Sequence, residues 1–330
     1  MSEAKEPLFE VKGLEVEFET DSGPARAVRG VDFTVNRGET VALVGESGCG
    51  KSVTALATMG LLPNSARVRG SVRIGGKELI GLPEPELRRV RGGEIAMVFQ
   101  EPMTSLNPVF RIGQQIAEVL VLHRGLDERA ARREAIELLA RVGIPLPERR
   151  VDQYPHELSG GMKQRVMIAM AIAGRPRLLI ADEPTTALDV TIQAQILELL
   201  QSLRRDHDMA MLMITHDLGI VAHFAERVNV MYAGKLVESS RVVDLFDAPL
   251  HPYTRALLGA LPRPGRSRER LEAIPGRVPP PDRMPRGCPF APRCKLSMPV
   301  CAERMPELAE RAPEHRAACF ALDEPRAAGT

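Results

Sequence analysis

Residues 40–52 constrain the fold of this 330-residue chain more than any other segment. They begin with the short apolar run TVALV at 40–44, which is typical of a strand buried on both faces. The pattern G-x-x-x-x-G-K-[ST] follows at 45–52, and a helix-compatible stretch at 51–62 ends before Pro63. Strand, glycine loop and helix in this order form a phosphate-binding loop. The sequence therefore predicts an α/β core that binds a nucleotide.

Each part of this loop has a chemical task. Glycines let backbone N–H groups turn inward around phosphate oxygens, and the N-terminus of the helix adds a favourable dipole. We expect Lys51 to reach the β- and γ-phosphates and Ser52 to offer its hydroxyl to Mg²⁺. Cys49 fills a variable position and is interpreted as a small filler rather than a redox sensor. The predicted ATP-binding residues are Gly45, Glu46, Ser47, Gly48, Cys49, Gly50, Lys51 and Ser52.

A second apolar strand, at residues 178–181, ends in two carboxylates. The carboxyl ends of parallel strands face the ligand crevice of an α/β sheet. Asp182 is therefore expected to hold Mg²⁺, and Glu183 to polarise the water that attacks the γ-phosphate. An isolated pair of this kind could equally be a solvated strand end.

A second anion-binding helix start is predicted at Ser159, Gly160 and Gly161, directly before an apolar helix at 166–173. Taken alone, these residues would be an ordinary helix cap and turn. A chain with two phosphate-binding helix ends is also suited to holding a nucleotide between two copies of itself.

Hydrophobic patterning predicts the surrounding architecture. Alternation at residues 11–18 and 31–35 indicates two antiparallel strands with one solvated face. The region 100–162 is mainly helical, with helices expected at 112–124 and 127–142. Strands and helices then alternate, as in a parallel α/β sheet, at 178–181, 189–205, 209–215 and 228–232.

Composition argues against several functional classes. The formal net charge is only +1, aromatic residues are 4% of the chain, and Trp is absent. A basic surface or a stacking platform for nucleic acid is therefore not expected. The acidic N-terminus lacks a signal peptide, and no apolar run approaches the length of a membrane span. We accordingly expect a chain that neither crosses a membrane nor is exported.

The last part of the chain has a different composition. Residues 262–285 are rich in Pro and Arg, which indicates a linker or an extended wrap. The tail beyond is too small to fold on an apolar core alone. Its four thiols could bind Zn²⁺ or an iron–sulfur cluster, and the absence of C-x₂-C pairs slightly favours the cluster. These four residues are Cys288, Cys294, Cys301 and Cys319.

Together, these motifs resemble ATP-binding-cassette (ABC) ATPases over residues 8–261. The resemblance also includes Gln100, Asp189 and His216, each in the order that the family shows. It implies a RecA-like P-loop ATPase core with an antiparallel β subdomain, a helical insert subdomain and a small Cys-rich C-terminal extension. The implied domains are an ATPase at 1–261, with its insert at about 100–162, and a linker with extension at 262–330.

The resemblance also implies individual roles. Gln100 would contact Mg²⁺, together with Ser52 and Asp182, as well as the attacking water. His216 would contact the γ-phosphate. Asp189 would reach across a dimer interface. Ser159 and Gly161 would cap the γ-phosphate held by the opposite subunit, with Gly160 between them. Phe18 would stack on adenine, although it could equally be a core residue of its strand.

Within the superfamily, residues 100–108, the sequence HPYT at 251–254 and the Cys-rich tail resemble ATPases of dipeptide and oligopeptide permeases. This closer resemblance implies ATP hydrolysis that powers peptide import from the cytoplasmic face of the membrane. It also implies a [4Fe-4S] cluster on the four cysteines, with Zn²⁺ as the alternative. The segment 100–108 would lie beside a groove that faces the membrane subunits.

The implied partners are a second ATPase subunit, identical or paralogous, two membrane permease subunits and, indirectly, an extracytoplasmic solute-binding protein; nucleic acid is not among them. Three alternatives stay open. The chain could be a soluble cassette ATPase that acts on ribosomes or DNA, although it has no second phosphate loop and no heptad run. The same kind of transporter could move nickel or another solute. The chain could also be an iron–sulfur scaffold that ATP merely switches.

Overall fold

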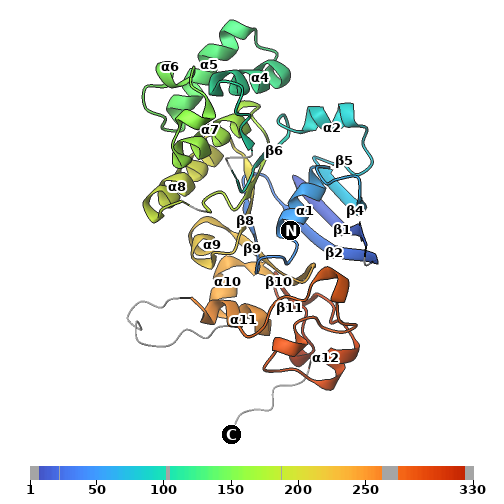
Figure 1. The fold of residues 1–330 in the computed structure, drawn as a ribbon. Coiled ribbons are helices and arrows are strands. Elements are labelled where there is room, and N and C mark those ends of the chain that lie inside the picture. Colours follow the sequence, from blue (N-terminus) through green and yellow to red (C-terminus); the bar gives the residue numbers. More distant parts are fainter. Residues whose placement is uncertain (1–6, 22, 102–104, 187, 262–273, 324–330) are drawn as a thin grey trace, which may run out of the picture. The chain divides into compact units, whose positions relative to one another are not determined.

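The computed structural model describes residues 7–21, 23–101, 105–186, 188–261 and 274–323 (Figure 1). These residues form two compact units that interleave along the sequence, and each is described by itself. Three predicted segments lie outside the described residues: positions 102–104, position 187 and the linker residues 262–273. None of the described helices combines the length and the apolar character that a bilayer span needs.

The first unit, called here the helical unit, contains residues 35–39 and 74–213 and the few described residues before Glu10. Its strands lie in the order β8-β7-β6. β6 (Ile95–Val98) pairs in parallel with β7 (Leu178–Asp182), and most of β8 (Ala210–Thr215) belongs to the same unit. Every residue of these strands is buried, as in a parallel sheet that is covered on both faces.

Helices make up most of the rest of this unit, and α4, α5 and α7 pack against one another (Figure 1). α4 ends at Gly125, whose φ of 64° suits glycine, and Asp127 caps α5 by accepting from the Ala130 N–H at 2.8 Å. The predicted helices at 112–124 and 127–142 are therefore present. The elements are β5 (Lys77–Glu78), α2 (Glu84–Val90), α4 (Ile112–Arg124), α5 (Glu128–Arg141), α6 (Pro147–Arg150), η1 (Pro155–Glu157), α7 (Gly160–Ala173) and α8 (Val190–Asp206).

The second unit, called here the loop unit, contains residues 10–34, 40–73 and 214 onward. One of its sheets has the order β2-β1-β4, formed by β1 (Phe9–Thr20), β2 (Gly23–Val35) and β4 (Ala66–Ile74). A two-residue connection joins β1 to β2, so these neighbours run antiparallel. The predicted antiparallel strands are present and are longer than the alternation indicated.

The other sheet of the loop unit has the order β11-β12-β10-β9-β3. β3 pairs in parallel with β9, whereas β9, β10, β12 and β11 pair antiparallel in turn. Four helices precede the extension among the described residues of this unit. These elements are β3 (Thr40–Val44), α1 (Lys51–Thr58), α9 (Leu218–Phe224), β9 (Arg227–Tyr232), β10 (Lys235–Arg241), α10 (Val242–Asp247) and α11 (Pro252–Gly259).

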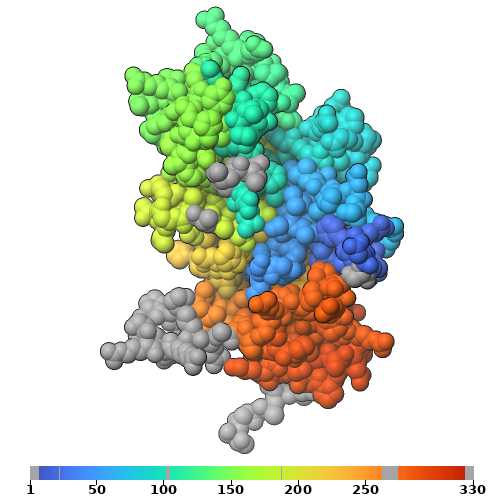
Figure 2. Space-filling view, in the orientation of Figure 1, coloured from blue at the N-terminus to red at the C-terminus, as the bar shows by residue number. Residues whose placement is uncertain are grey.

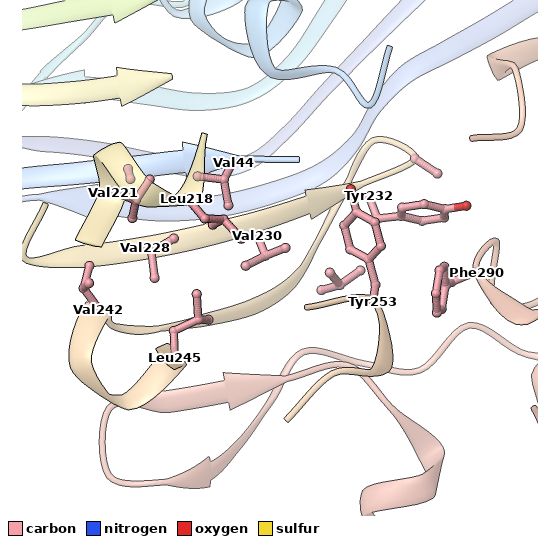
Figure 3. Packing of buried hydrophobic residues seen from close by; sticks show 13 residues of the cluster. Val44, Leu218, Val221, Val228, Val230, Tyr232, Val242, Leu245, Tyr253 and Phe290 are labelled. Atoms are coloured by element: carbon pink, nitrogen blue, oxygen red, sulfur yellow. The ribbon is translucent and has the colours of Figure 1, made fainter. Parts of the chain in front are cut away.

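The C-terminal extension is part of the loop unit rather than an independent module. β12 pairs with β10, with Ala317 opposite Glu238, and Phe290 is buried in the cluster that also holds Tyr232 and Tyr253 (Figure 3). The extension thus shares an existing core, which explains how so short a segment can be ordered. Its elements are η2 (Pro281–Arg283), η3 (Ala291–Arg293), α12 (Pro299–Glu303), β11 (Ala309–Ala312), β12 (His315–Ala317) and η4 (Phe320–Leu322).

One predicted boundary is wrong. α1 ends at Thr58 instead of continuing to residue 62. The N–H groups of Met59 and Gly60 bond back to carbonyls of the last turn, and Gly60 has a φ of 61°. A glycine in the left-handed region therefore ends this helix before Pro63 can do so.

Candidate nucleotide-binding site

The phosphate loop connects β3 to α1, as the sequence predicts. Gly45, Gly48 and Gly50 have φ values of 155°, 78° and 107°, which other residues adopt only with strain. A Cβ at Gly45 would lie 2.2 Å from the Met231 carbonyl oxygen, and one at Gly50 would lie 2.7 Å from the Ala27 carbonyl oxygen. The backbone of β9 and β2 thus fixes the path of the loop and leaves no space for side chains at these two positions.

Lys51 lies inside this loop, with only 5% of its surface exposed. Its ammonium group donates to the carbonyl oxygens of Gly45, at 2.8 Å, and Glu46, at 3.2 Å. A buried cation at the start of a helix, enclosed by glycine backbone, is a suitable environment for a phosphate chain. Burial raises the pKa of the Cys49 thiol, so this side chain stays neutral and acts as a filler.

The loop unit also carries His216 and Phe18. His216 is exposed directly after β8, and Asp217 caps α9 by accepting from the N–H groups of Gly219 and Ile220. Phe18 is half-buried on β1. A partly accessible ring is compatible with adenine stacking, which stays a prediction.

In the helical unit, β7 ends at the predicted carboxylates. Asp182 is only 4% exposed, and Glu183 follows it with a φ of 46°. The Glu183 Oε2 accepts from Gln100 Nε2 at 3.0 Å and from the Thr186 hydroxyl at 2.9 Å. A non-glycine residue at positive φ marks backbone strain of the kind that gathers at functional sites. The structure thus brings Gln100 and Glu183 together, although 83 positions separate them in sequence.

The second predicted anion site is at the start of α7. Ser159 caps this helix by accepting from the Met162 N–H at 3.4 Å, and both Ser159 and Gly160 are exposed. A Cβ at Gly160 would meet no atom within 4 Å, whereas one at Gly161 would lie 3.1 Å from the Ile192 side chain. Asp189 is exposed and caps α8 through the Ile192 N–H at 3.0 Å. The start of α7 at Ser159 and Gly160 is therefore exposed on the surface of the helical unit.

Similarity to known proteins agrees with this geometry. Residues 28–186 match the family described as ABC transporter, and residues 237–301 match the family described as oligopeptide/dipeptide transporter, C-terminal region. The oligopeptide transport ATP-binding protein OppD of Haemophilus influenzae is 52% identical over 291 residues, which cover 88% of this chain and 90% of the relative. OppD of Bacillus subtilis is 53% identical over 296 residues, which cover 89% and 83%. This chain belongs to the ABC transporter family of ATP-binding proteins.

Solved structures support the same assignment. The ATP-binding cassette MJ0796, in a dimeric post-hydrolysis state bound to ADP and Pi, superposes with a TM-score of 0.63 at 28% identity. The alignment covers 71% of this ABC ATPase and 98% of that chain. The predicted fold class, a P-loop ATPase of the ABC type, is thereby confirmed, and with it the assignment to ATP hydrolysis.

Two partners of the phosphate loop in this ABC ATPase were not found by sequence reasoning. The Tyr253 hydroxyl accepts from the Glu46 N–H at 2.8 Å, and Arg293 pairs with the Glu46 carboxylate at 3.0 Å. Tyr253 belongs to the sequence HPYT at 251–254, which by itself indicates only a resemblance to peptide-permease ATPases. For Arg293 the sequence contains no signal, since it is one of many arginines in the tail.

In the segment that follows Gln100 in this ABC ATPase, Glu101 and the residues from Ser105 onward are described. Gln115 of α4 holds it: its Oε1 accepts from the Asn107 N–H at 2.9 Å, and its Nε2 donates to the carbonyl oxygens of Asn107 and Phe110 at 3.0 Å. Val109 and Phe110 are 70% and 51% exposed. An anchored loop with neighbouring exposed apolar side chains is typical of a surface that contacts another protein.

The four cysteines of the extension do not form a ligand group. Among the described residues, no three His, Cys, Asp or Glu side chains gather closely enough to hold a metal ion. Burial raises the pKa of Cys288 to about 11, with smaller contributions from Cys301 and Cys294. Burial also raises the pKa of Cys294 and of Cys319, so these thiols are neutral at pH 7. The cysteines influence one another as neighbours, but their arrangement gives the predicted cluster no support.

Proposed function

We propose that this chain is the ATP-hydrolysing subunit of a transporter that imports peptides through partner permeases, acting at the cytoplasmic face of the membrane. The contact between Gln100 and Glu183, at the strained end of β7, is the observation that supports hydrolysis most directly. The peptide substrate is supported by the OppD relatives and by the match of residues 237–301.

Residues of each unit have their own part in the proposed chemistry. Lys51 and the N–H groups of the loop bind the phosphate chain. Ser52, Asp182 and Gln100 would hold Mg²⁺, which would supply neutralising charge when bound. Glu183 acts as the general base that orients the attacking water and takes its proton. In the structure its carboxylate is held by Gln100 and Thr186, so the base is fixed before the substrate arrives. His216 contacts the γ-phosphate.

We further propose that hydrolysis requires a second ATPase subunit, identical or paralogous. The exposed helix start at Ser159 and Gly160 is suited to cap a phosphate on another chain, and exposed Asp189 is suited to contact that chain. The MJ0796 cassette, whose structure is dimeric and bound to ADP and Pi, provides the comparison.

The proposed contact with the permease is the segment from Glu101 to Phe110, of which positions 102–104 lie outside the described residues. Exposed Val109 and Phe110 would receive an apolar element of a membrane subunit, and Gln115 would hold the segment in place. The solute-binding protein would act through the permease alone. The division at residue 261 between ATPase domain and extension stays a prediction.

The decisive experiment reconstitutes this chain with its permease subunits in vesicles and measures ATP hydrolysis with oligopeptides, dipeptides and nickel chelates. Stimulation by peptides supports the proposal. Stimulation by nickel chelates alone would replace the substrate while keeping the mechanism. Hydrolysis stimulated by ribosomes or DNA, with no response to any solute, would favour the soluble cassette ATPase.

The [4Fe-4S] cluster remains a proposal that depends on the four cysteines of the sequence. If it is present, anaerobically purified protein contains iron and acid-labile sulfide in about equal amounts, and Cys294→Ser removes both. A colourless protein with one zinc per chain would select the alternative metal. Protein with neither metal would show that the neutral thiols of the structure are the native state.

A further inference from the structure

The C-terminal extension contacts the phosphate loop through a bidentate ion pair. Arg293, at the end of η3, donates from Nη1 to Glu46 Oε2 at 3.0 Å and from Nη2 to Glu46 Oε1 at 3.1 Å. The pair joins positions 247 apart in sequence. Parallel hydrogen bonds between guanidinium and carboxylate fix orientation as well as charge. Both residues lie in the loop unit, so this contact is internal to one compact body.

Arg293 is held firmly for this task. Its side chain is 6% exposed, its Nε donates to the Pro275 carbonyl oxygen at 2.7 Å, and its Nη1 donates to the Tyr232 hydroxyl at 3.2 Å. The guanidinium also lies 5.7 Å from the Tyr232 ring centroid and 5.9 Å from that of Phe290. A buried guanidinium with this many partners has little freedom to leave Glu46.

Tyr253 supports the same loop residue from the main-chain side. Its hydroxyl accepts from the Glu46 N–H, so this N–H is committed to the protein rather than to a phosphate. Its ring lies 4.7 Å from Tyr232 and 5.4 Å from Phe290, centroid to centroid. Figure 3 shows these three aromatic side chains in the same cluster. The His251 Nδ1 accepts from the Tyr253 N–H at 3.1 Å and thereby caps the helix that carries Tyr253. Side chains of β9, α11 and the extension thus pack together next to the phosphate loop.

We propose that Arg293 and Tyr253 are positioning residues of the ATP site, which makes the C-terminal extension a working part of nucleotide binding. Tyr253 sets the orientation of the peptide that follows Gly45. Arg293 neutralises a carboxylate that stands inside the phosphate loop. Neither residue touches the nucleotide; both act through Glu46. The inference depends on ATP hydrolysis by this chain and not on which solute is transported.

The electrostatic reason is specific to Glu46. A carboxylate that is 27% exposed and one residue away from Gly45 would repel the negative triphosphate that the loop is built to hold. The pairing cancels this repulsion with a cation that is already in place. Burial alone would lower the pKa of Arg293, but its hydrogen bonds to Glu46 and Tyr232 outweigh burial and raise it, so the charge is permanent. Figure 2 shows the described part of the extension, in orange and red, as a closely packed body.

A double-mutant cycle on the full-length chain tests this role. Arg293→Met keeps the apolar length of the side chain but leaves Glu46 unpaired, so the KM for ATP should rise about tenfold while kcat changes less than about twofold. Glu46→Gln alone removes the charge that would repel ATP but leaves the Arg293 cation without its carboxylate partner, so KM should rise by less than in Arg293→Met. In the double variant the unpaired charge is gone, and KM should return to within about threefold of wild type.

The rescue distinguishes charge neutralisation from mere support of the fold. A double variant that binds ATP as poorly as Arg293→Met would overturn the proposal, since lost packing alone predicts no recovery. Arg304→Met is the matched control, because Arg304 lies in the same extension over the Phe320 ring and away from the loop. An equal rise of KM in that variant would also overturn the proposal.

Milder substitutions test the same role if the Arg293→Met variant does not fold. Arg293→Lys retains the cation but loses the bidentate hydrogen-bonding geometry of the guanidinium. Its KM for ATP should lie between those of wild type and Arg293→Met. Tyr253→Phe removes only a hydroxyl and should raise KM about threefold. Wild-type KM in both variants would refute the proposal. Peptide-stimulated transport is measured separately, so a failure of this inference cannot be mistaken for a failure of the proposed function.

Discussion

The two glycine-containing helix starts of this chain are built in opposite ways. The start of α1 is enclosed: Lys51 is buried in its loop, and Arg293 and Tyr253 hold the loop from behind. The start of α7 is open: Ser159 and Gly160 are exposed, and the helix is capped only by its own serine. Under the proposed function, the enclosed helix start would bind ATP within its own chain, whereas the open one would cap ATP that another subunit holds.

The largest effect is expected at the catalytic carboxylate. Glu183→Gln keeps the volume and the hydrogen-bonding partners but cannot accept a proton, so ATP hydrolysis should fall by at least about 100-fold while ATP binding persists. Steady-state hydrolysis and equilibrium nucleotide binding measure the two effects. Thr186→Val, which removes only one donor to Glu183, provides the control and should cost about tenfold or less. Near wild-type hydrolysis in Glu183→Gln would assign the base elsewhere.

The open helix start gives the next largest effect. Ser159→Arg places a long cation over exposed N–H groups, so hydrolysis should fall about 100-fold while the same chain still binds ATP through its own loop. Lys51→Ala should instead weaken binding and hydrolysis together. Nucleotide affinity by fluorescence and hydrolysis by phosphate release separate the two.

Mixing these variants tests whether the open helix start serves another chain. A tethered dimer of Lys51→Ala and Ser159→Arg chains keeps one composite site intact and should still close around one ATP. A dimer with both substitutions on the same chain has no intact composite site and is the control. Failure of the mixed dimer, together with closure of the control dimer around one ATP, would show that each α7 serves the ATP of its own chain.

The sequence predicts those parts of the two helix starts that depend on neighbouring residues, and not those that depend on contacts between distant segments. Local sequence patterns, such as the spacing of glycines or the end of an apolar strand, predict the phosphate loop, the two carboxylates and the capping Ser159. The contacts between Glu46, Arg293 and Tyr253 join distant segments, and no local pattern encodes them. The pairing of β12 with β10 is likewise non-local. The sequence, in which the tail is poor in apolar residues, therefore gives no sign that the extension shares the core.

A third prediction extends the contrast to the surface after Gln100. Phe110→Asp places a charge on an exposed apolar position and should leave the basal hydrolysis of the isolated chain unchanged. In the reconstituted transporter it should abolish peptide-stimulated hydrolysis, because the proposed permease contact is apolar. Leu122, 69% exposed in the same unit, gives the matched control as Leu122→Asp. Equal loss of stimulation in both variants would mean that the contact surface is larger than the segment after Gln100.

The smallest effect concerns the acid sensitivity of the enclosed half. His251 is the N-cap of the helix that carries Tyr253, and its ring is buried. This burial lowers the pKa of His251 to about 3. Its pKa in the unfolded chain is about 6.5, so between these values the unfolded state binds a proton that the folded state does not. The free energy of unfolding therefore rises with pH across this window. When the pH is lowered from 7 to 5.5, the titration of His251 should decrease it by about 1 kcal/mol.

His251→Asn isolates that contribution, because asparagine can still cap a helix but does not titrate in this range. The free energy of unfolding in urea, measured for wild type and variant at several pH values, should differ by an amount that shrinks by about 1 kcal/mol between pH 7 and pH 5.5. His156→Asn, at an exposed position shortly before the start of α7, is the matched control for the loss of an imidazole. A constant difference for His251→Asn would show that the ring is reached by water or protonated in the folded state. The residues that pack against the phosphate loop around Tyr253 would then be more accessible to water than the structure implies.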